Sequence, residues 1–427
     1  MEACRGPSEA WAEWTARRLA ELRDRRVLRS LRALSPVLGD ASAVVLDAGT
    51  RDSWARDAPS LGEWEGAQTE RLVLFAANDY LGLSAHADVR AAAAAAAAES
   101  GCGPRASPLV SGYTHAHRRL ESDLAALKGT EEALVLPTGY AANLAVLGAL
   151  ADSPSAAIFS DALNHASIVD GARLAARGAG AALHVYKHND MADLGAQLAA
   201  STAARKLIVS DSLFSMDGDY ADVRALVALR ASHGALLVLD DAHATLVCGE
   251  GGGGVAQMQG VRPEEVDVTV GTLSKAFGAH GGFVACSAQL KRLLVSTGRP
   301  VIFSTALPAP AVAAASAALR AATPALRAKL WANVRLFAAE TGLPAASPIV
   351  PVVVGDEADA LALSAALLAD GFFVPAIRPP TVPRGSSRLR VTLSAAHDEA
   401  DVRALAAALR RHGACGARAA GRLRAKL

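Results

Sequence analysis

Short apolar runs alternate with segments of helical length between residues 75 and 305. These runs are rich in Val, Ile and Leu, and they lie at 133–136, 156–159, 183–186, 207–210, 236–239 and 266–270. Strands that are buried on both faces are continuously apolar, and helices between successive strands are typical of parallel connections. The pattern therefore predicts an α/β fold in which helices cover a mostly parallel sheet.

The chain after residue 305 has a different pattern. An Ala-rich helical stretch is followed by apolar runs at 349–354, 372–374 and 389–393 and by helical segments near 357–370 and 398–412. We predict a large domain over 76–305 and a smaller α+β domain over 306–427. Residues 8–34 have the pattern of an amphipathic helix with Trp11 and Trp14 available for packing, and we expect residues 1–75 to pack with the small domain.

Composition narrows the class of protein. The 427 residues are 52% hydrophobic and 20% charged, which is enough to bury a large core. A formal net charge of +1 gives no reason to expect a nucleic acid as partner. The alanine run at 91–98 is the longest apolar stretch and is too short to span a bilayer, so no membrane is expected either. Five scattered cysteines without a CxxC pair argue against disulfides and structural zinc.

The two termini bear on localisation. The Arg-rich N-terminal segment also contains acidic residues, which import presequences lack. The chain ends in Ala425-Lys426-Leu427, a near variant of the Ser-Lys-Leu peroxisomal address. We therefore expect a peroxisomal import receptor as a partner and the peroxisome as the location, with the cytosol as the alternative.

Polar residues follow three of the predicted strands, where ligands of parallel sheets bind. Gly139 opens a helix after 133–136, and a helix N-terminus can hold a phosphate. Asp240 and His243 follow 236–239, and Lys275 lies among small residues after 266–270. Each feature has an ordinary alternative, which is a turn, a polar cluster or metal pair, and a surface lysine respectively.

Together, a phosphate-binding turn, a carboxylate and a lysine in this order favour pyridoxal phosphate. A lysine can hold the cofactor as a Schiff base, and a carboxylate can keep its ring nitrogen protonated. The glycine run at 251–254 has no lysine after it, so a nucleoside-triphosphate loop is not expected. His115 and His117 are spaced like metal ligands, but they follow a Gly/Ser-rich stretch and we assign them to a loop; no metal is predicted.

Eight motifs that occur in one order between residues 71 and 410 resemble those of the α-oxoamine synthases, a family of fold-type I pyridoxal phosphate-dependent transferases. The motifs are NDYLGL from Asn78, SGY from Ser111 with His117 and Glu121, TGYAAN from Thr138, NHAS from Asn164, FSMDGD from Phe214, DDAH from Asp240, TLSK from Thr272 and AIRPPTVP from Ala376. The resemblance implies a seven-stranded, mostly parallel sheet, pyridoxal 5'-phosphate as cofactor, and a homodimer with the site across two subunits.

The last motif is most similar to the family branch that condenses L-alanine with pimeloyl-CoA to give 8-amino-7-oxononanoate in biotin biosynthesis. The stretches SDSLFSMDGD and VCGE resemble its plant-type forms, although Asp211 stands where the family commonly has Glu. Another α-oxoamine synthase, such as a glycine C-acetyltransferase, and a non-catalytic scaffold subunit stay open as alternatives. Whether the acyl group arrives on CoA or on a carrier protein also stays open.

The resemblance also implies roles for single residues. Lys275 binds the cofactor and moves the substrate α-proton, Asp240 pairs with the ring nitrogen, and His165 stacks on the ring. The other cofactor contacts fall on Ser215 and His243 at the phenolic oxygen, and on Gly139, Tyr140 and Thr272, with Ser304 and Thr305 of the partner, at the phosphate. The substrate contacts fall on Asn78 and Arg378 at the amino-acid carboxylate and on Arg32 at the acyl substrate.

Overall fold

The structure is a computed structural model, and it describes residues 8–25, 34–47 and 69–415. Its residues form two compact units. Of the described residues, the larger comprises 38–42, 75–351 and 391–415, and the smaller comprises 8–25, 34–37, 43–47, 69–74 and 352–390. These units differ from the three predicted segments, because residues 306–351 and the last helix group with the larger unit.

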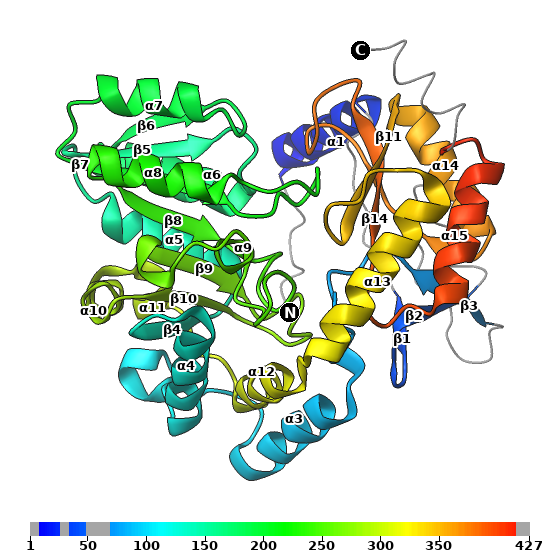
Figure 1. Cartoon of the computed structure of the whole chain (residues 1–427), viewed down its shortest axis with the longest axis horizontal. Coiled ribbons are helices and arrows are strands. Elements are labelled where there is room, and N and C mark those ends of the chain that lie inside the picture. The colour runs from blue at the N-terminus through cyan, green and yellow to red at the C-terminus, as the bar shows by residue number, and fades with distance from the viewer. Residues whose placement is uncertain (1–7, 26–33, 48–68, 416–427) are drawn as a thin grey trace. The chain divides into compact units, whose positions relative to one another are not determined.

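A seven-stranded sheet forms the centre of the larger unit (Figure 1). Its strands stand in the order β4-β10-β9-β8-β7-β5-β6. Only β10 runs antiparallel to its neighbours, and the pairs among β5 to β9 are parallel. The strands are β4 (Glu132–Leu136), β5 (Ala156–Asp161), β6 (Ala182–Tyr186), β7 (Arg205–Asp211), β8 (Leu236–Asp240), β9 (Val268–Thr272) and β10 (Gly282–Cys286). The predicted mostly parallel α/β fold is confirmed.

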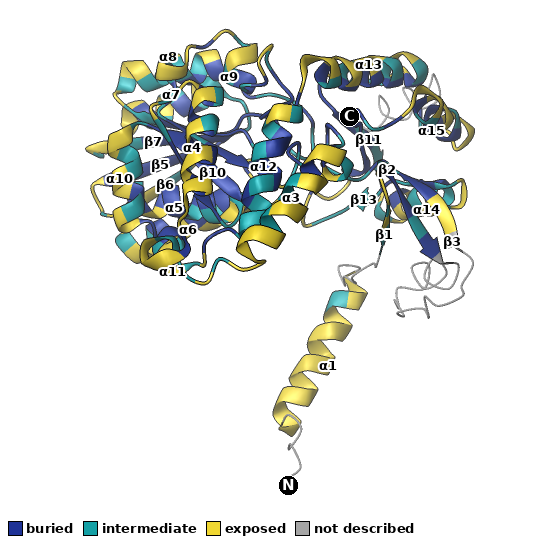
Figure 2. Cartoon of the chain, turned by 90° about the horizontal axis from the view of Figure 1, so that it is seen from below, coloured by how far each residue is buried: buried dark blue, intermediate teal, exposed yellow. Residues whose placement is uncertain are grey.

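Helices pack against this sheet, and Figure 2 shows buried residues along its strands and exposed residues on the outer faces of the helices. The longer helices of the larger unit are α3 (Ala87–Ser100), α4 (His115–Lys128), α5 (Gly139–Leu150), α6 (Ala166–Ala179), α7 (Met191–Ala200), α8 (Val223–His233), α10 (Ala288–Thr297), α12 (Ala309–Ala321), α13 (Pro324–Thr341) and α15 (Glu399–Arg411). Short helical segments are η1 (Leu83–Ala85), η2 (Pro108–Gly112), α9 (Val255–Met258), η3 (Pro263–Glu265) and α11 (Arg299–Phe303).

The core between helices and sheet explains why α5 and α6 are fixed in place. Val146 of α5 and Ile168 of α6 are fully buried, and they belong to one apolar cluster with Val209, Val238 and Val270 of the strands. Burial of aliphatic side chains of this size stabilises a fold by about 2 kcal/mol each. The N-termini of α5 and α6 are therefore held at defined positions beyond the carboxyl ends of the strands.

One strand begins later than the sequence predicts. The apolar run at 266–270 is shifted, because β9 begins at Val268 and Asp267 takes another role. The carboxylate of Asp267 accepts the N–H of Leu237 at 2.8 Å and bonds the guanidinium of Arg230. It thereby links the start of β8 to the residue that precedes β9.

The smaller unit contains strands from distant parts of the chain. β2 (Asp40–Asp47) pairs antiparallel with β3 (Thr69–Leu74), and Val73 and Leu74 of β3 pair with β12 (Phe372–Phe373). The other elements are α1 (Glu9–Asp24), β1 (Ser35–Val37), β11 (Ile349–Gly355), α14 (Glu357–Ala369), β13 (Ala376–Ile377) and β14 (Ser387–Thr392), of which β11 and β14 cross the unit boundary. Residues before 75 and after 351 thus share one sheet.

Helix α1 confirms part of the helix predicted over 8–34, and residues 26–33 lie outside the described part of the chain. Trp11 and Trp14 lie edge to face with ring centres 5.5 Å apart, and both are largely exposed. Their expected packing is therefore not seen among the described residues. Within the same residues, every helix is too short or too polar to traverse a bilayer.

Candidate active site

Three buried aspartates end adjacent strands of the large sheet. Asp161, Asp211 and Asp240 are the last residues of β5, β7 and β8, and each is at most 6% exposed. Buried carboxylates are costly unless hydrogen bonds satisfy them. Their partners define a polar region at the edge of the sheet where the sequence predicts the ligand site.

Asp240 receives its hydrogen bonds from neutral groups. Its Oδ2 accepts from Nδ2 of Asn143 at 2.6 Å, and its Oδ1 accepts the backbone N–H of Ala242 at 2.8 Å. Neutral donors orient a carboxylate without cancelling its charge. Asp240 can therefore present a negative charge to a protonated ring nitrogen, as predicted for its role.

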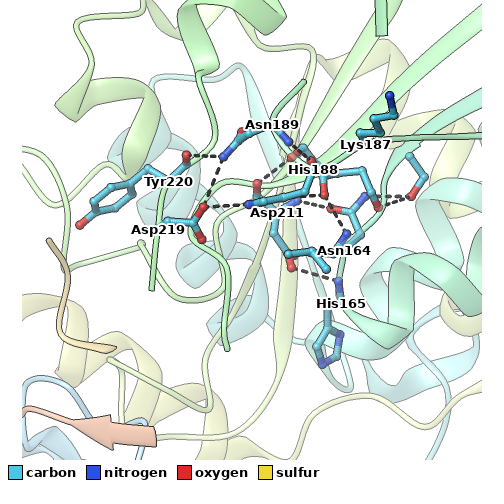
Figure 3. A network of polar contacts seen from close by, with 12 residues as sticks. Asn164, His165, Lys187, His188, Asn189, Asp211, Asp219 and Tyr220 are labelled. Carbon is cyan, nitrogen blue, oxygen red and sulfur yellow. Dashed lines mark hydrogen bonds and ion pairs between the residues drawn. The ribbon is translucent and has the colours of Figure 1, made fainter. Parts of the chain in front are cut away.

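His165 caps the N-terminus of α6 and is hydrogen-bonded to the end of β7. Its backbone N–H donates to the carboxylate of Asp211 at 3.0 Å, and the adjacent Asn164 bonds the Asp211 N–H at 2.7 Å (Figure 3). Burial lowers the pKa of His165, although the charge of Asp240 opposes this. Burial, together with repulsion from Asp240, raises the pKa of Asp211 well above its usual range.

Lys275 lies in the turn between β9 and β10. Its Nζ is 2.9 Å from Nε2 of His243, and Nδ1 of His243 is 2.6 Å from the hydroxyl of Tyr80. That hydroxyl also donates to Oδ1 of Asn78 at 3.4 Å. The structure thus brings three predicted site residues, Lys275, His243 and Asn78, into one hydrogen-bonded chain.

Tyr80 is the link in this chain that sequence analysis missed. It is fully buried and lies in the motif NDYLGL, where only Asn78 received a role. The sequence did contain a sign of this role, because a tyrosine inside a site motif can hydrogen-bond other side chains of the site. Its partner His243 lies 163 residues later, and this contact is not visible in any local pattern.

The N-terminus of α5 has the features of a phosphate site. The Thr138 hydroxyl accepts the Ala141 N–H, and the first helical bond runs from Ala142 N–H to Thr138 O, so the N–H groups of Gly139 and Tyr140 precede it. A Cβ on Gly139 would stand 3.2 Å from Cβ of Thr272. A glycine therefore lets this helix end approach the β9 strand that leads to Lys275.

The remaining predicted residues lie at separate places. Ser215 is in the tight turn after β7, where the Gly218 N–H donates to Phe214 O at 2.9 Å. Ser304 and Thr305 follow α11, and the side chain of Tyr140 donates to Asp170 at 2.6 Å. Arg378 follows β13 in the smaller unit. Arg32 lies outside the described residues.

The histidines His115 and His117 are not in a loop, because they begin helix α4. His117 shares a capping box with Thr114, and its Nε2 bonds the carbonyl of Leu307 at 3.0 Å. Helix capping and packing explain this residue. In the described ranges, no three His, Cys, Asp or Glu side chains gather in a way that suits a metal ion.

These residues fit pyridoxal phosphate. An amine stands at hydrogen-bond distance from an imidazole, a buried carboxylate accepts from the neutral donors Asn143 and Ala242, and a helix that begins with Gly139 lies beside Thr272. They are the groups needed to hold an aldehyde, a ring nitrogen and a phosphate respectively.

Comparisons with known proteins agree with this chemistry. Residues 70–409 match the family model of the class I and II aminotransferases. The chain is 49% identical over 385 residues to the 8-amino-7-oxononanoate synthase of Arabidopsis thaliana, covering 84% of this chain and 81% of the relative. It is 50% identical over 378 residues to the synthase of the same name from Anaeromyxobacter dehalogenans, covering 86% and 94% respectively.

Solved structures give the same picture. The chain resembles a structure of SPT with its PLP internal aldimine at a TM-score of 0.82 and 29% identity, covering 96% of this chain and all of that one. It resembles the 8-amino-7-oxononanoate synthase of Francisella tularensis at a TM-score of 0.67 and 25% identity, covering 80% and 97%. A chain bound to PLP thus shares the fold described above.

Proposed function

Because this chain belongs to the class I and II aminotransferase family and, within it, to the 8-amino-7-oxononanoate synthases, we propose that it condenses L-alanine with pimeloyl-CoA. The products are 8-amino-7-oxononanoate, CoA and CO2. The enzyme is a pyridoxal phosphate-dependent acyltransferase of biotin biosynthesis. The observation that supports the proposal best is Lys275, whose amine lies 2.9 Å from His243 at the edge of the sheet that also holds Asp240.

Eight predicted residues of the larger unit would hold the cofactor. Lys275 would bind its aldehyde, Asp240 its ring nitrogen and His165 its ring face. His243 and Ser215 would contact its phenolic oxygen, and Gly139, Tyr140 and Thr272 would contact its phosphate. When bound, pyridoxal phosphate supplies an acceptor for the electron pair that alanine leaves on its α-carbon when it loses a proton or CO2.

The protein residues perform the proton transfer. Lys275 accepts the α-proton of alanine when its amine is neutral, and it later returns a proton to the same carbon. His243 orients the amine, and Tyr80 holds His243 through its other ring nitrogen. Asn78 and Arg378 are proposed to bind the alanine carboxylate, so that its α-carbon faces Lys275.

The reaction exchanges two bonds at the α-carbon of alanine. A carbon–carbon bond forms between the α-carbon of alanine and the thioester carbonyl carbon, and CoA leaves as its thiol. The bond between the α-carbon and the carboxylate then breaks to release CO2. The proton that leaves the α-carbon before the first step balances the proton taken up by the CoA thiol, and one proton from solvent replaces it on the α-carbon after the second step.

We further propose a homodimer, with Ser304 and Thr305 serving the site of the partner. Apolar side chains beside these residues support it, because Leu109, Val110 and Phe303 are 53%, 79% and 69% exposed. They belong to η2 and α11, which pack together, and large exposed apolar patches mark interaction surfaces. Phe303→Asp should give monomers with weaker cofactor binding in analytical ultracentrifugation and equilibrium dialysis; an unchanged dimer would contradict this surface.

For location we propose the peroxisome, supported by the C-terminal Ala425-Lys426-Leu427. These three residues lie outside the described part of the chain. A fluorescent protein fused to the N-terminus should enter peroxisomes, and deletion of the last three residues should leave it in the cytosol. Cytosolic fluorescence of the intact fusion would contradict the proposal.

The decisive assay measures thiol release and product mass. Purified protein with pyridoxal phosphate, L-alanine and pimeloyl-CoA should release CoA and form 8-amino-7-oxononanoate, and Lys275→Ala should do neither. Glycine with acetyl-CoA tests for a glycine C-acetyltransferase, and pimeloyl carrier protein tests the other acyl donor. Product from glycine and acetyl-CoA alone would overturn the assignment.

A further inference from the structure

Two buried residues connect the acid that faces the ring nitrogen to the histidine that faces the ring. We propose that Asn143 and Ser167 are positioning residues that hold His165 as the neutral tautomer with its proton on Nε2, and that tie this ring to Asp240. This inference rests on the proposed function for the roles of Asp240 and His165. It gives a role to Asn143 and Ser167, which have none in the proposed function, and it specifies the protonation state of His165.

The connection is a continuous hydrogen-bonded chain. Nδ2 of Asn143, on α5, is 2.6 Å from Oδ2 of Asp240 and 2.8 Å from Oγ of Ser167. Oγ of Ser167, in the first turn of α6, is 2.7 Å from Nδ1 of His165. Asn143 and Ser167 are 2% and 1% exposed, so water does not compete for these bonds.

The direction of each bond follows from the chemistry of the groups. The carboxylate of Asp240 only accepts, so the Asn143 amide must present its NH₂ group there, and the second proton of that group reaches Ser167 Oγ. The backbone N–H of Ser167 can only donate, and it lies 3.2 Å from Nδ1 of His165. Nδ1 must therefore be the unprotonated nitrogen.

The Ser167 hydroxyl completes the chain. Because its oxygen accepts from Asn143, its own proton is directed to Nδ1 of His165, 2.7 Å away. Two donors then converge on one ring nitrogen, and a proton on that nitrogen would oppose both. The proton of the neutral imidazole is left on Nε2.

This arrangement separates the charges of the site. Asp240 would attract a proton to a nearby imidazole, and an imidazolium there would cancel part of the charge that the ring nitrogen needs. The Asn143–Ser167 pair opposes that protonation while it gives Asp240 a neutral donor. Asn143 also lies one helical turn after Gly139, so α5 joins the phosphate turn to the acid.

The test is histidine-selective ¹⁵N labelling of the full-length holoenzyme without substrates. The chain has 11 histidines, and the signals lost in His165→Asn identify His165. The proposal expects a protonated Nε2, an unprotonated Nδ1 and no titration between pH 6 and 8. A wild-type His165 that is protonated on Nδ1, or that is doubly protonated, overturns it without any variant.

Ser167→Ala removes the hydroxyl, and Ser167→Thr is the matched control that keeps it. In Ser167→Ala only the longer bond from the backbone N–H of residue 167 remains at Nδ1, so the Nε2-protonated form should be less strongly favoured, His165 should titrate within this range, and kcat should fall about tenfold with little change in the KM for alanine. Ser167→Thr should restore all three. A Ser167→Ala protein with the wild-type nitrogen spectrum overturns the proposal.

The outcomes separate this inference from the proposed function. If wild type and Ser167→Ala both fail to form 8-amino-7-oxononanoate while the nitrogen spectra of His165 differ between them as expected, only the proposed function fails. If wild type is active and Ser167→Ala keeps the tautomer, only this inference fails.

Discussion

Two consecutive carboxylates, Asp240 and Asp241, lie in opposite kinds of surroundings. Asp240 accepts hydrogen bonds from the amide of Asn143 and the N–H of Ala242. Asp241 forms a buried ion pair with Lys128, whose Nζ is 2.8 Å from Oδ2, and its Oδ1 accepts from the Ser212 hydroxyl. Both acids are nearly fully buried.

The two acids differ in whether a cation is paired with the carboxylate. Lys128 also donates to Thr245 Oγ1 and Gly253 O, so its three protons and the charge of Asp241 are satisfied within the protein. Asp240 accepts from the neutral donors Asn143 and Ala242 and forms no such ion pair with a lysine among the described residues. An acid paired with a lysine contributes to structure, whereas an acid with neutral donors can act on a ligand.

The largest effect is expected from Asp240→Asn. The substitution keeps the shape of the side chain and removes its charge, so kcat should fall about 10³-fold while the protein stays folded. Thiol release and thermal unfolding measure the two properties. Activity within tenfold of wild type would show that the charge of Asp240 is not needed.

The next effect concerns the other acid. Lys128→Met leaves Asp241 buried without its cation, and the free energy of unfolding should fall by about 3 kcal/mol in urea titrations. Activity per folded molecule should change little. A stable Lys128→Met protein would mean that Asp241 finds another partner.

A double substitution sharpens this point. Lys128→Met combined with Asp241→Asn removes both charges, so the loss of stability should be clearly smaller than the sum of the two single losses. The same urea titrations measure it. Additive losses would contradict direct coupling between the two side chains.

The smallest effect is expected at His188, which lies near Asp219 in Figure 3 and joins two carboxylates. Its Nδ1 is 2.9 Å from Asp161 and its Nε2 is 2.8 Å from Asp219, so both nitrogens donate. Burial alone would lower the pKa of His188, but these carboxylates raise it above its ordinary value.

The pH dependence follows from that direction. The stabilisation should be complete below the unfolded pKa of about 6.5 and should disappear as pH rises through the folded pKa. His188→Gln should therefore lower stability by about 1 kcal/mol at pH 5.5 and by less at pH 9. His115→Gln, at an exposed helix start, is the control, and a pH-independent loss in His188→Gln would rule out the charged form.

The sequence predicted Lys275, Asp240 and Gly139 because each follows an apolar run, and the position of a residue relative to a strand is a local property. It did not predict Asn143, Ser167 or Tyr80 as partners. Asn143 and Asp240 are 97 residues apart, and only packing of α5 against the sheet brings them together.

The same reason explains why a motif could not separate Asp240 from Asp241. The partner of Asp241 is Lys128, 113 residues earlier on α4. In the fold, the antiparallel strand β10 and the later start of β9 were also missed. Gly282 in β10 approaches the backbone of Thr138, and Asp267 binds Arg230, and neither contact has a local signal.

One measurement tests most directly whether Asp240 acts on the cofactor while Asp241 serves the structure. It is the visible absorption spectrum and cofactor affinity of the pyridoxal phosphate-loaded protein, compared among wild type, Asp240→Asn and Asp241→Asn at equal folded concentration. Asp240→Asn should change the absorption band and weaken cofactor binding at least tenfold, whereas Asp241→Asn should leave both unchanged. Equal changes in the two variants, or an unaltered Asp240→Asn spectrum, would contradict the account.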